Sequence, residues 1–193
     1  MTKLILAEKP QAAKKIGYAL SREEPEFVNK RGAYWLEFER NGEKIIVAPA
    51  VGHLFTLKSK EEGWDYPVFN VEWVEIFKEN KSSKYAKKYY DNLREVSKEA
   101  DEIITGTDYD QEGDALALLI LKYIFDVEDA QRMKFSTLTP SELNQAFEER
   151  LDGMDLGQAQ AGITRHILDF YHGVNLSRAL IKAVKANNRY KTL

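Results

Sequence analysis

Four carboxylates fall within seven residues of the chain, between two apolar runs; they are Asp108, Asp110, Glu112 and Asp114. The run before them, Ile103-Ile104, predicts a short buried strand, and residues 115–121 after them predict a buried helix. Carboxylates this close together repel one another unless a positive charge lies among them, and Mg²⁺ prefers carboxylate and phosphate oxygens. We therefore expect the acids at the rim of a sheet, as a magnesium site rather than a solvated, helix-capping turn.

A fifth carboxylate, Glu8, repeats this local design. It follows the apolar run at residues 3–7 and precedes Pro10, which suits the first turn of a helix. If the two strands are neighbours in a parallel sheet, their carboxyl ends place Glu8 beside Asp108 and Asp110. Acidic neighbours would favour protonation of Glu8, which suits a general acid or base, whereas the alternative is a helix-terminal acid stabilised by the macrodipole.

The remaining elements are predicted from turns and periodicity. Asn41-Gly42 between two apolar runs predicts a β-hairpin, which we place as an insertion at about residues 31–57. Strands are expected at 72–77 and 132–136 and a helix at 82–99. Thr139-Pro140-Ser141-Glu142 has the pattern of a capping box and predicts a helix to about Leu151. A last helix is expected from Gln158 to about Asn187, bent or broken near Gly173.

These elements predict an α/β fold. Strands alternate with helices at both ends of the chain, which favours a mainly parallel, Rossmann-like sheet flanked by helices, with a C-terminal helical extension. At 193 residues, with 44% hydrophobic and 31% charged residues, the composition is that of a globular protein. No apolar run reaches the length of a membrane span, and Glu8 comes too early for a signal peptide.

Composition also limits the chemistry. The chain has no cysteine, which excludes disulfides and thiolate metal sites and fits a cytoplasmic protein. The net charge of −3 gives no global argument for nucleic-acid binding, so such binding must come from local patches. The histidines, His53, His166 and His172, lie far apart in sequence, and no pair has a ligand spacing supported by nearby acids. Tyr109 is expected to pack into the sheet.

Five segments in order resemble the motifs of one family. They are Leu6-Ala7-Glu8-Lys9-Pro10, Val51-Gly52-His53-Leu54, residues 107–114, the segment from Phe135 to Thr139, and residues 165–178 with Arg165, Asp169, Gly173, Asn175, Ser177 and Arg178. The first and third resemble the Toprim domain, and the full set is similar to type IA DNA topoisomerases of archaeal and bacterial type. The resemblance implies a Toprim domain at residues 1–152 and the start of a helical DNA-binding domain at 153–193.

The resemblance also implies a reaction. In that family a tyrosine attacks a phosphodiester of single-stranded DNA, becomes joined to the 5′ phosphate and releases a 3′ hydroxyl, and the break is resealed to relax supercoils. Glu8 would then be the acid that protonates the leaving oxygen, and Lys9 would contact the scissile phosphate. Asp108, Asp110 and Glu112 would hold Mg²⁺.

Further roles carried over by the resemblance lie on the last helix. Arg165, Asp169, Ser177 and Arg178 would position negatively supercoiled or single-stranded DNA. For Arg165 and Asp169 the alternative is an ordinary ion pair one helical turn apart.

Three features depart from the family pattern. Gln111 stands where the family usually has arginine, so one phosphate-binding charge is missing, and Asp114 stands where glutamate is usual. None of the ten tyrosines lies in the setting of the family's nucleophile. The chain is thus expected to be the N-terminal part of a larger enzyme, inactive without its remaining domains. The alternatives are a stand-alone, metal-dependent Toprim nuclease or primase-like protein, and a non-catalytic DNA-binding module.

Overall fold

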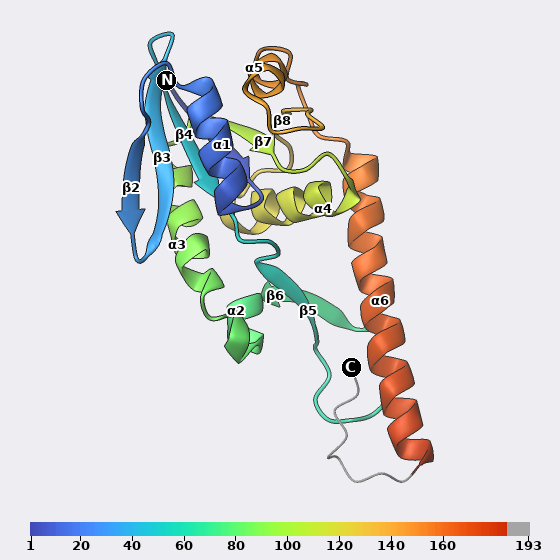
Figure 1. The fold of residues 1–193 in the computed structure, drawn as a ribbon. Helices are drawn as coiled ribbons and strands as arrows, with labels where there is room; N and C mark the ends of the chain where they lie inside the picture. Colours follow the sequence, from blue (N-terminus) through green and yellow to red (C-terminus); the bar gives the residue numbers. More distant parts are fainter. Residues whose placement is uncertain (185–193) are drawn as a thin grey trace.

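The computed structural model describes residues 1–184, which fold around a six-stranded sheet with a two-stranded sheet beside it (Figure 1). The strands are β1 (Thr2–Ala7), β2 (Glu26–Lys30), β3 (Ala33–Arg40), β4 (Glu43–Pro49), β5 (Phe55–Ser59), β6 (Val71–Glu75), β7 (Glu102–Gly106) and β8 (Gln131–Arg132). The helices are α1 (Pro10–Leu20), α2 (Ile76–Glu79), α3 (Ala86–Val96), α4 (Gln111–Ile120), α5 (Pro140–Glu148) and α6 (Leu156–Ala183).

Strand β1 lies in the middle of the large sheet, whose order is β2-β3-β4-β1-β7-β8. It pairs in parallel with β4 and β7, and β7 pairs in parallel with β8, while β2, β3 and β4 pair in antiparallel fashion. The prediction of a mainly parallel α/β sheet flanked by helices is confirmed.

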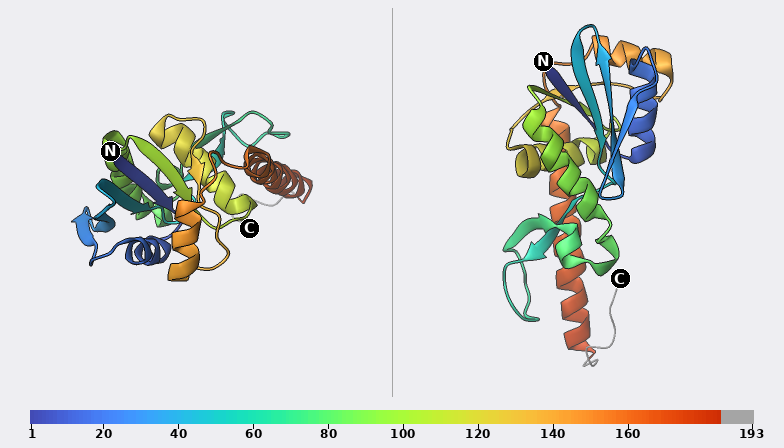
Figure 2. Two further views of the ribbon diagram at one scale, coloured as in Figure 1. Left: turned by 90° about the horizontal axis from the view of Figure 1, so that it is seen from above. Right: turned by 90° about the vertical axis from the view of Figure 1, so that its left-hand side faces the viewer.

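Alternate residues of β1 enter two separate apolar cores, because successive side chains of a strand point to opposite faces. Ile5 packs with α1 and α5 on one face of the sheet. Leu4 and Leu6 pack with α3 and α4 on the other face, and Figure 2 shows the sheet between these helices. The all-apolar sequence of β1 thus reflects burial on both faces.

The hairpin forms at the predicted turn. Asn41 and Gly42 have φ angles of 55° and 80°, the left-handed conformation that a tight hairpin turn requires. Its second strand, β4, is also the parallel neighbour of β1, so the hairpin extends the main sheet instead of standing apart from it.

Several expected boundaries are wrong. Of the expected strand at 132–136 only Arg132 lies in a strand, because β8 spans Gln131–Arg132 and pairs with β7 over these two residues alone. Glu142 does not complete a capping box with Thr139. Its carboxylate instead accepts hydrogen bonds from the backbone N–H groups of Ser136 and Thr137, which tie the preceding turn to α5.

The last helix is continuous where a break was expected. α6 runs from Leu156 to Ala183 without interruption at Gly173, and the expected end near Asn187 lies outside the described residues. No helix within residues 1–184 is both long and apolar enough to cross a membrane. In Figure 1, α6 leaves the α/β core and continues past β5 and β6.

α6 packs closely against α4 at Gly162. A Cβ atom at this position would overlap the carbonyl oxygen of Gln111 and lie 2.8 Å from the Cβ of Ala115. At Gly173, on the same helix, a Cβ atom would meet nothing within 4 Å. The two glycines therefore differ in purpose: one permits helix contact, and the other only weakens the helix.

We predict that Gly162→Ala and Gly173→Ala change stability in opposite directions. The overlap at Gly162 should lower the free energy of unfolding by about 1–3 kcal/mol, as overpacking does. Gly173→Ala should raise it by roughly 0.5–1 kcal/mol, since alanine favours the helix. Urea denaturation followed by circular dichroism measures both, and equal effects of the two variants would contradict the packing argument.

Candidate functional site

Glu8 and Asp108 meet at the carboxyl ends of two adjacent strands. β1 and β7 are parallel neighbours with Ala7 opposite Gly106, which is the condition under which Glu8 was expected beside Asp108. Lys9 joins the two acids: its Nζ lies 2.6 Å from Glu8 Oε1 and 3.8 Å from Asp108 Oδ2. The Glu8 side chain is only 15% exposed, whereas that of Lys9 is 59% exposed.

The charges at this edge influence one another. Partial burial of the carboxylate, and then the negative charge of Glu8, raise the pKa of Asp108 above its ordinary value. The hydrogen bond from Lys9 to Glu8, and then the charge of Glu8, raise the pKa of Lys9. In both shifts the negative charge of Glu8 takes part: it disfavours a second negative charge on Asp108 and favours the positive charge of Lys9.

Asp110 begins α4 and shapes the acidic turn. Its Oδ1 accepts a hydrogen bond of 2.7 Å from the Gly113 N–H, so one of its two carboxylate oxygens is used as a helix cap. The turn is tight, because a Cβ atom at Gly113 would overlap the carbonyl oxygen of Asp108. Glycine at 113 therefore lets the start of α4 approach the end of β7.

Asp114 does not lie at the rim, so that expectation is wrong for this one acid. It is fully buried and pairs with the fully buried Arg132, with Arg132 Nη2 2.9 Å from Asp114 Oδ1. Gln158 of α6 donates to Asp114 Oδ2 at 2.6 Å. Asp114, expected at the rim, is thus a buried residue whose contacts join α4 to β8 and α6.

Arg132 also holds the backbone of the acidic turn. Its Nη1 donates to the carbonyl of Thr107 and its Nη2 to that of Asp108, each at 2.8 Å. This role was not predicted from the sequence, where the available signal was a charged residue in an expected short strand. Tyr109 is 37% exposed, its ring lying 5.4 Å from Arg132 Cζ and 4.8 Å from Lys134 Nζ, so its expected packing into the sheet is wrong.

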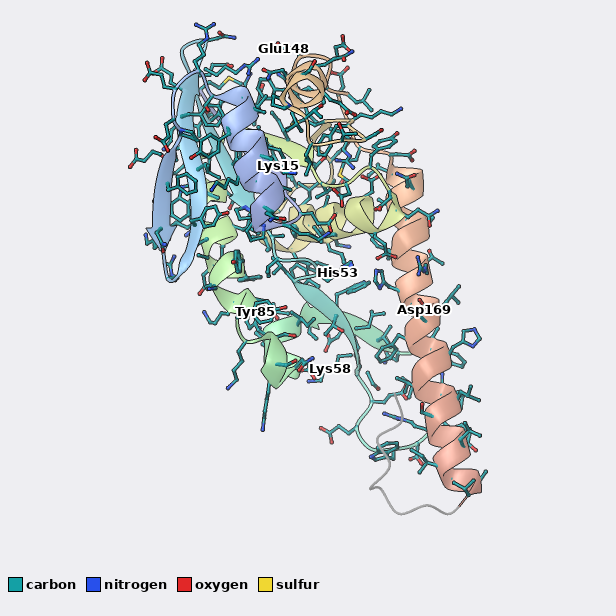
Figure 3. The ribbon with its side chains drawn as sticks, in the orientation of Figure 1. Lys15, His53, Lys58, Tyr85, Glu148 and Asp169 are labelled. Atoms are coloured by element: carbon teal, nitrogen blue, oxygen red, sulfur yellow. The ribbon has the colours of Figure 1, made fainter. Side chains whose placement is uncertain are left out.

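Glu112 makes its contacts with two histidines and an arginine. Its Oε2 lies 3.4 Å from His53 Nε2 and 2.8 Å from His166 Nε2, and Arg165 Nη1 lies 3.1 Å from its Oε1. The expectation that no histidine pair is supported by an acid is therefore wrong. Folding brings the segment after β4 against α6, and Figure 3 shows His53 on the side of the core that faces this helix.

Burial of the imidazole lowers the pKa of His53, and the neighbouring His166 lowers it further. The two rings lie edge to face, 4.8 Å apart between centroids. His53 is thus favoured in its neutral form, in which a ring nitrogen can accept a hydrogen bond or bind a cation.

The other predicted DNA-contacting residues are spread along α6. Arg165 Nε lies 3.8 Å from Asp169 Oδ2, and both side chains are mostly exposed, with Asp169 labelled in Figure 3. Ser177 lies farther along, and Arg178 donates to the carbonyl of Asp65 at 2.6 Å and lies over the ring of Trp64. The structure therefore brings Arg165 to the acidic turn and places Arg178 beside the loop between β5 and β6.

The family model and the similar proteins that the comparisons found point to the same family. Residues 3–138 match the family described as Toprim domain. The chain is 48% identical over 195 residues to DNA topoisomerase 1 of Methanocaldococcus jannaschii, with 100% of this chain and 25% of that protein covered. It is 30% identical over 192 residues to DNA topoisomerase 3 of Staphylococcus haemolyticus, with 93% of this chain and 25% of that protein covered.

A solved structure supports the same fold. Full-length topoisomerase I from Thermotoga maritima matches with a TM-score of 0.62 at 23% identity, covering 92% of this chain and 26% of that chain. The resemblance to a topoisomerase Toprim domain that the motifs indicated is confirmed by these matches. The chain spans about a quarter of the length of these relatives.

We predict that Arg132→Met lowers the free energy of unfolding by about 3–5 kcal/mol, because it leaves the Asp114 carboxylate buried without its partner. The double variant Arg132→Met with Asp114→Asn removes the buried charge while keeping an acceptor for Gln158, and it should regain part of the loss. Urea denaturation measures both. A double variant no more stable than the single one would show that the buried charge is not the cause.

Proposed function

The chain belongs to the Toprim domain family, and we propose that it is the Toprim-bearing, N-terminal part of a cytoplasmic type IA DNA topoisomerase. Such an isomerase cleaves one DNA strand transiently, passes the other through and rejoins the break. The observation that carries the proposal is the meeting of Glu8, Lys9 and Asp108 at the carboxyl ends of β1 and β7. This is the edge at which open α/β sheets bind ligands.

Glu8 is proposed as the proton carrier. In cleavage it gives its proton to the 3′ oxygen that leaves the phosphate, and in rejoining it takes the proton back from the attacking 3′ hydroxyl. Its position supports this role, because the side chain lies at the carboxyl end of β1, largely shielded from solvent and joined through Lys9 to Asp108. The exposed Lys9 is proposed to contact the scissile phosphate and to stabilise charge that develops on its oxygens.

Mg²⁺ is proposed to bind at the acidic turn and, when bound, to position the scissile phosphate. Asp108 fits this role, since its side chain is 52% exposed and lies at the end of β7 beside the carboxylate of Glu8. Asp110 fits through the carboxylate oxygen that does not cap α4. Glu112 is proposed as the third ligand, although in this structure its oxygens contact Arg165, His53 and His166.

The partner is proposed to be single-stranded or negatively supercoiled DNA that passes along α6. It would be positioned by four residues of α6: Arg165, Asp169, Ser177 and Arg178. Arg165 lies beside the acidic turn, where its guanidinium supplies a positive charge that the uncharged Gln111 does not. We divide the chain into the Toprim domain at 1–152 and the start of a helical domain at 153–193. The tyrosine nucleophile is proposed to come from another domain of the same enzyme.

We predict that the chain binds Mg²⁺ weakly and that Asp108→Ala with Asp110→Ala abolishes this binding, because these two acids are exposed and lie together between the end of β7 and the start of α4. Calorimetric titration with Mg²⁺ measures the change. Glu61→Ala with Glu62→Ala, which removes two exposed acids in a loop, is the matched control and should bind like the parent. Absence of binding in the parent chain would favour a non-catalytic DNA-binding module.

We predict that Glu8→Gln, made in the full-length enzyme, slows both cleavage and rejoining by about 10²–10⁴-fold, the usual contribution of a general acid or base. Folding should be unaffected, since glutamine keeps the shape of the side chain. Single-turnover cleavage of a labelled oligonucleotide measures the rate, with Glu39→Gln on β3 as the exposed control. Near-normal turnover would exclude the proton-carrier role, and cleavage by this chain without any tyrosine domain would indicate a metal-dependent nuclease.

A further inference from the structure

Two histidines and a glutamate from three separate segments converge on one point. His53 follows β4, Glu112 is in the first turn of α4, and His166 is in α6. One ligand atom from each lies within 4.8 Å of the other two. We propose that these three side chains bind a transition-metal ion of the Zn²⁺ type, at a site beside the proposed magnesium site that has only Glu112 in common with it.

The distances suit such an ion. Ligand atoms held about 2.0–2.1 Å from a tetrahedral Zn²⁺ are roughly 3.3 Å from one another. Glu112 Oε2 lies 3.4 Å from His53 Nε2 and 2.8 Å from His166 Nε2, close to this spacing, and the three ligand atoms all lie within 4.8 Å of one another. Three protein ligands leave the fourth position for water, and all three side chains are half-buried, which gives water access to it.

The ligand types select against Mg²⁺. Imidazole nitrogen is a good ligand for Zn²⁺, Ni²⁺ and Cu²⁺, whereas Mg²⁺ takes oxygen ligands and keeps several of its waters. The acidic turn at Asp108 and Asp110 offers carboxylates alone and therefore has the opposite preference. The two sites are close in sequence but are distinguished by the chemistry of their ligands.

The surroundings orient the ligands. Arg165 holds Glu112 by its Oε1 at 3.1 Å and leaves Oε2 facing the histidines, and such a second contact commonly fixes a ligating carboxylate. The ring of Trp73 packs against that of His166 with centroids 6.1 Å apart. The His166 ring is thus held between Trp73 and the ring of His53.

An ion here would have a structural effect. It would join α6 to α4 and to the segment after β4, two parts of the α/β core. It would also hold Glu112 toward α6, so that this carboxylate would be shared between the two metal sites or withdrawn from the magnesium site. The proposed ion therefore couples the position of α6 to the ligands available at the acidic turn.

The test is calorimetric titration of the chain with ZnCl₂ in excess Mg²⁺ and without DNA, so that it does not depend on topoisomerase activity. We expect one Zn²⁺ per chain. His53→Gln and His166→Gln should each weaken binding by about tenfold or more, since each removes one of three protein ligands. His172→Gln is the matched control, because it removes the other histidine of α6, which is exposed and outside the cluster, and it should bind Zn²⁺ like the parent.

A thermal melt adds a readout of the structural effect. Zn²⁺ should raise the Tm of the parent and of His172→Gln, but not that of the double variant His53→Gln with His166→Gln, because only a bound ligand stabilises the folded state. Zinc binding retained by the double variant, or no zinc binding by the parent, would overturn the proposal. Asp108→Ala with Asp110→Ala should still bind Zn²⁺, so failure of the magnesium site and failure of this one can be told apart.

Discussion

The ion pair between Arg132 and Asp114 is the constraint on which the site depends. Both side chains are fully buried, so each charge requires the other, and the guanidinium also satisfies the carbonyls of Thr107 and Asp108. One interaction thereby fixes the end of β7, the start of α4 and the strand β8. The carboxylate of Asp108 can lie at the rim because its backbone is held from inside by a positive charge.

This internal charge also explains how so many acids can follow one strand. Of the four carboxylates in the turn, Asp114 is neutralised within the protein, Asp110 shares its charge with the N–H group of Gly113, and Glu112 is matched by Arg165. Asp108 remains beside Glu8, with Lys9 as their common cation. The four acids of the turn are therefore neutralised by different partners, and Asp108 shares its cation, Lys9, with Glu8.

The features that the sequence predicted are those with local causes. The apolar runs predicted β1 and β7, the Asn41-Gly42 pair predicted the hairpin turn, and Pro140 predicted the start of α5. The pairing of Arg132 with Asp114 and the meeting of His53 with His166 could not be predicted in this way. Both join segments distant in the chain, and their partners are decided by how β8 and α6 pack, for which no periodicity or turn residue gives a signal.

The contact at Gly162 has a mechanical consequence. α6 packs against α4 at this glycine, near its N-terminal end, and continues to Ala183 as one uninterrupted helix. A rotation of α6 about this contact would therefore move its C-terminal end the most. Leu180 lies about 27 Å along the helix from Gly162, at 1.5 Å per residue. A tilt of α6 by about 10° about Gly162 would move Leu180 by roughly 5 Å. The same tilt would move Arg165, beside the acidic turn, by less than about 1 Å, so a small shift there corresponds to a large one at the C-terminal end of the helix.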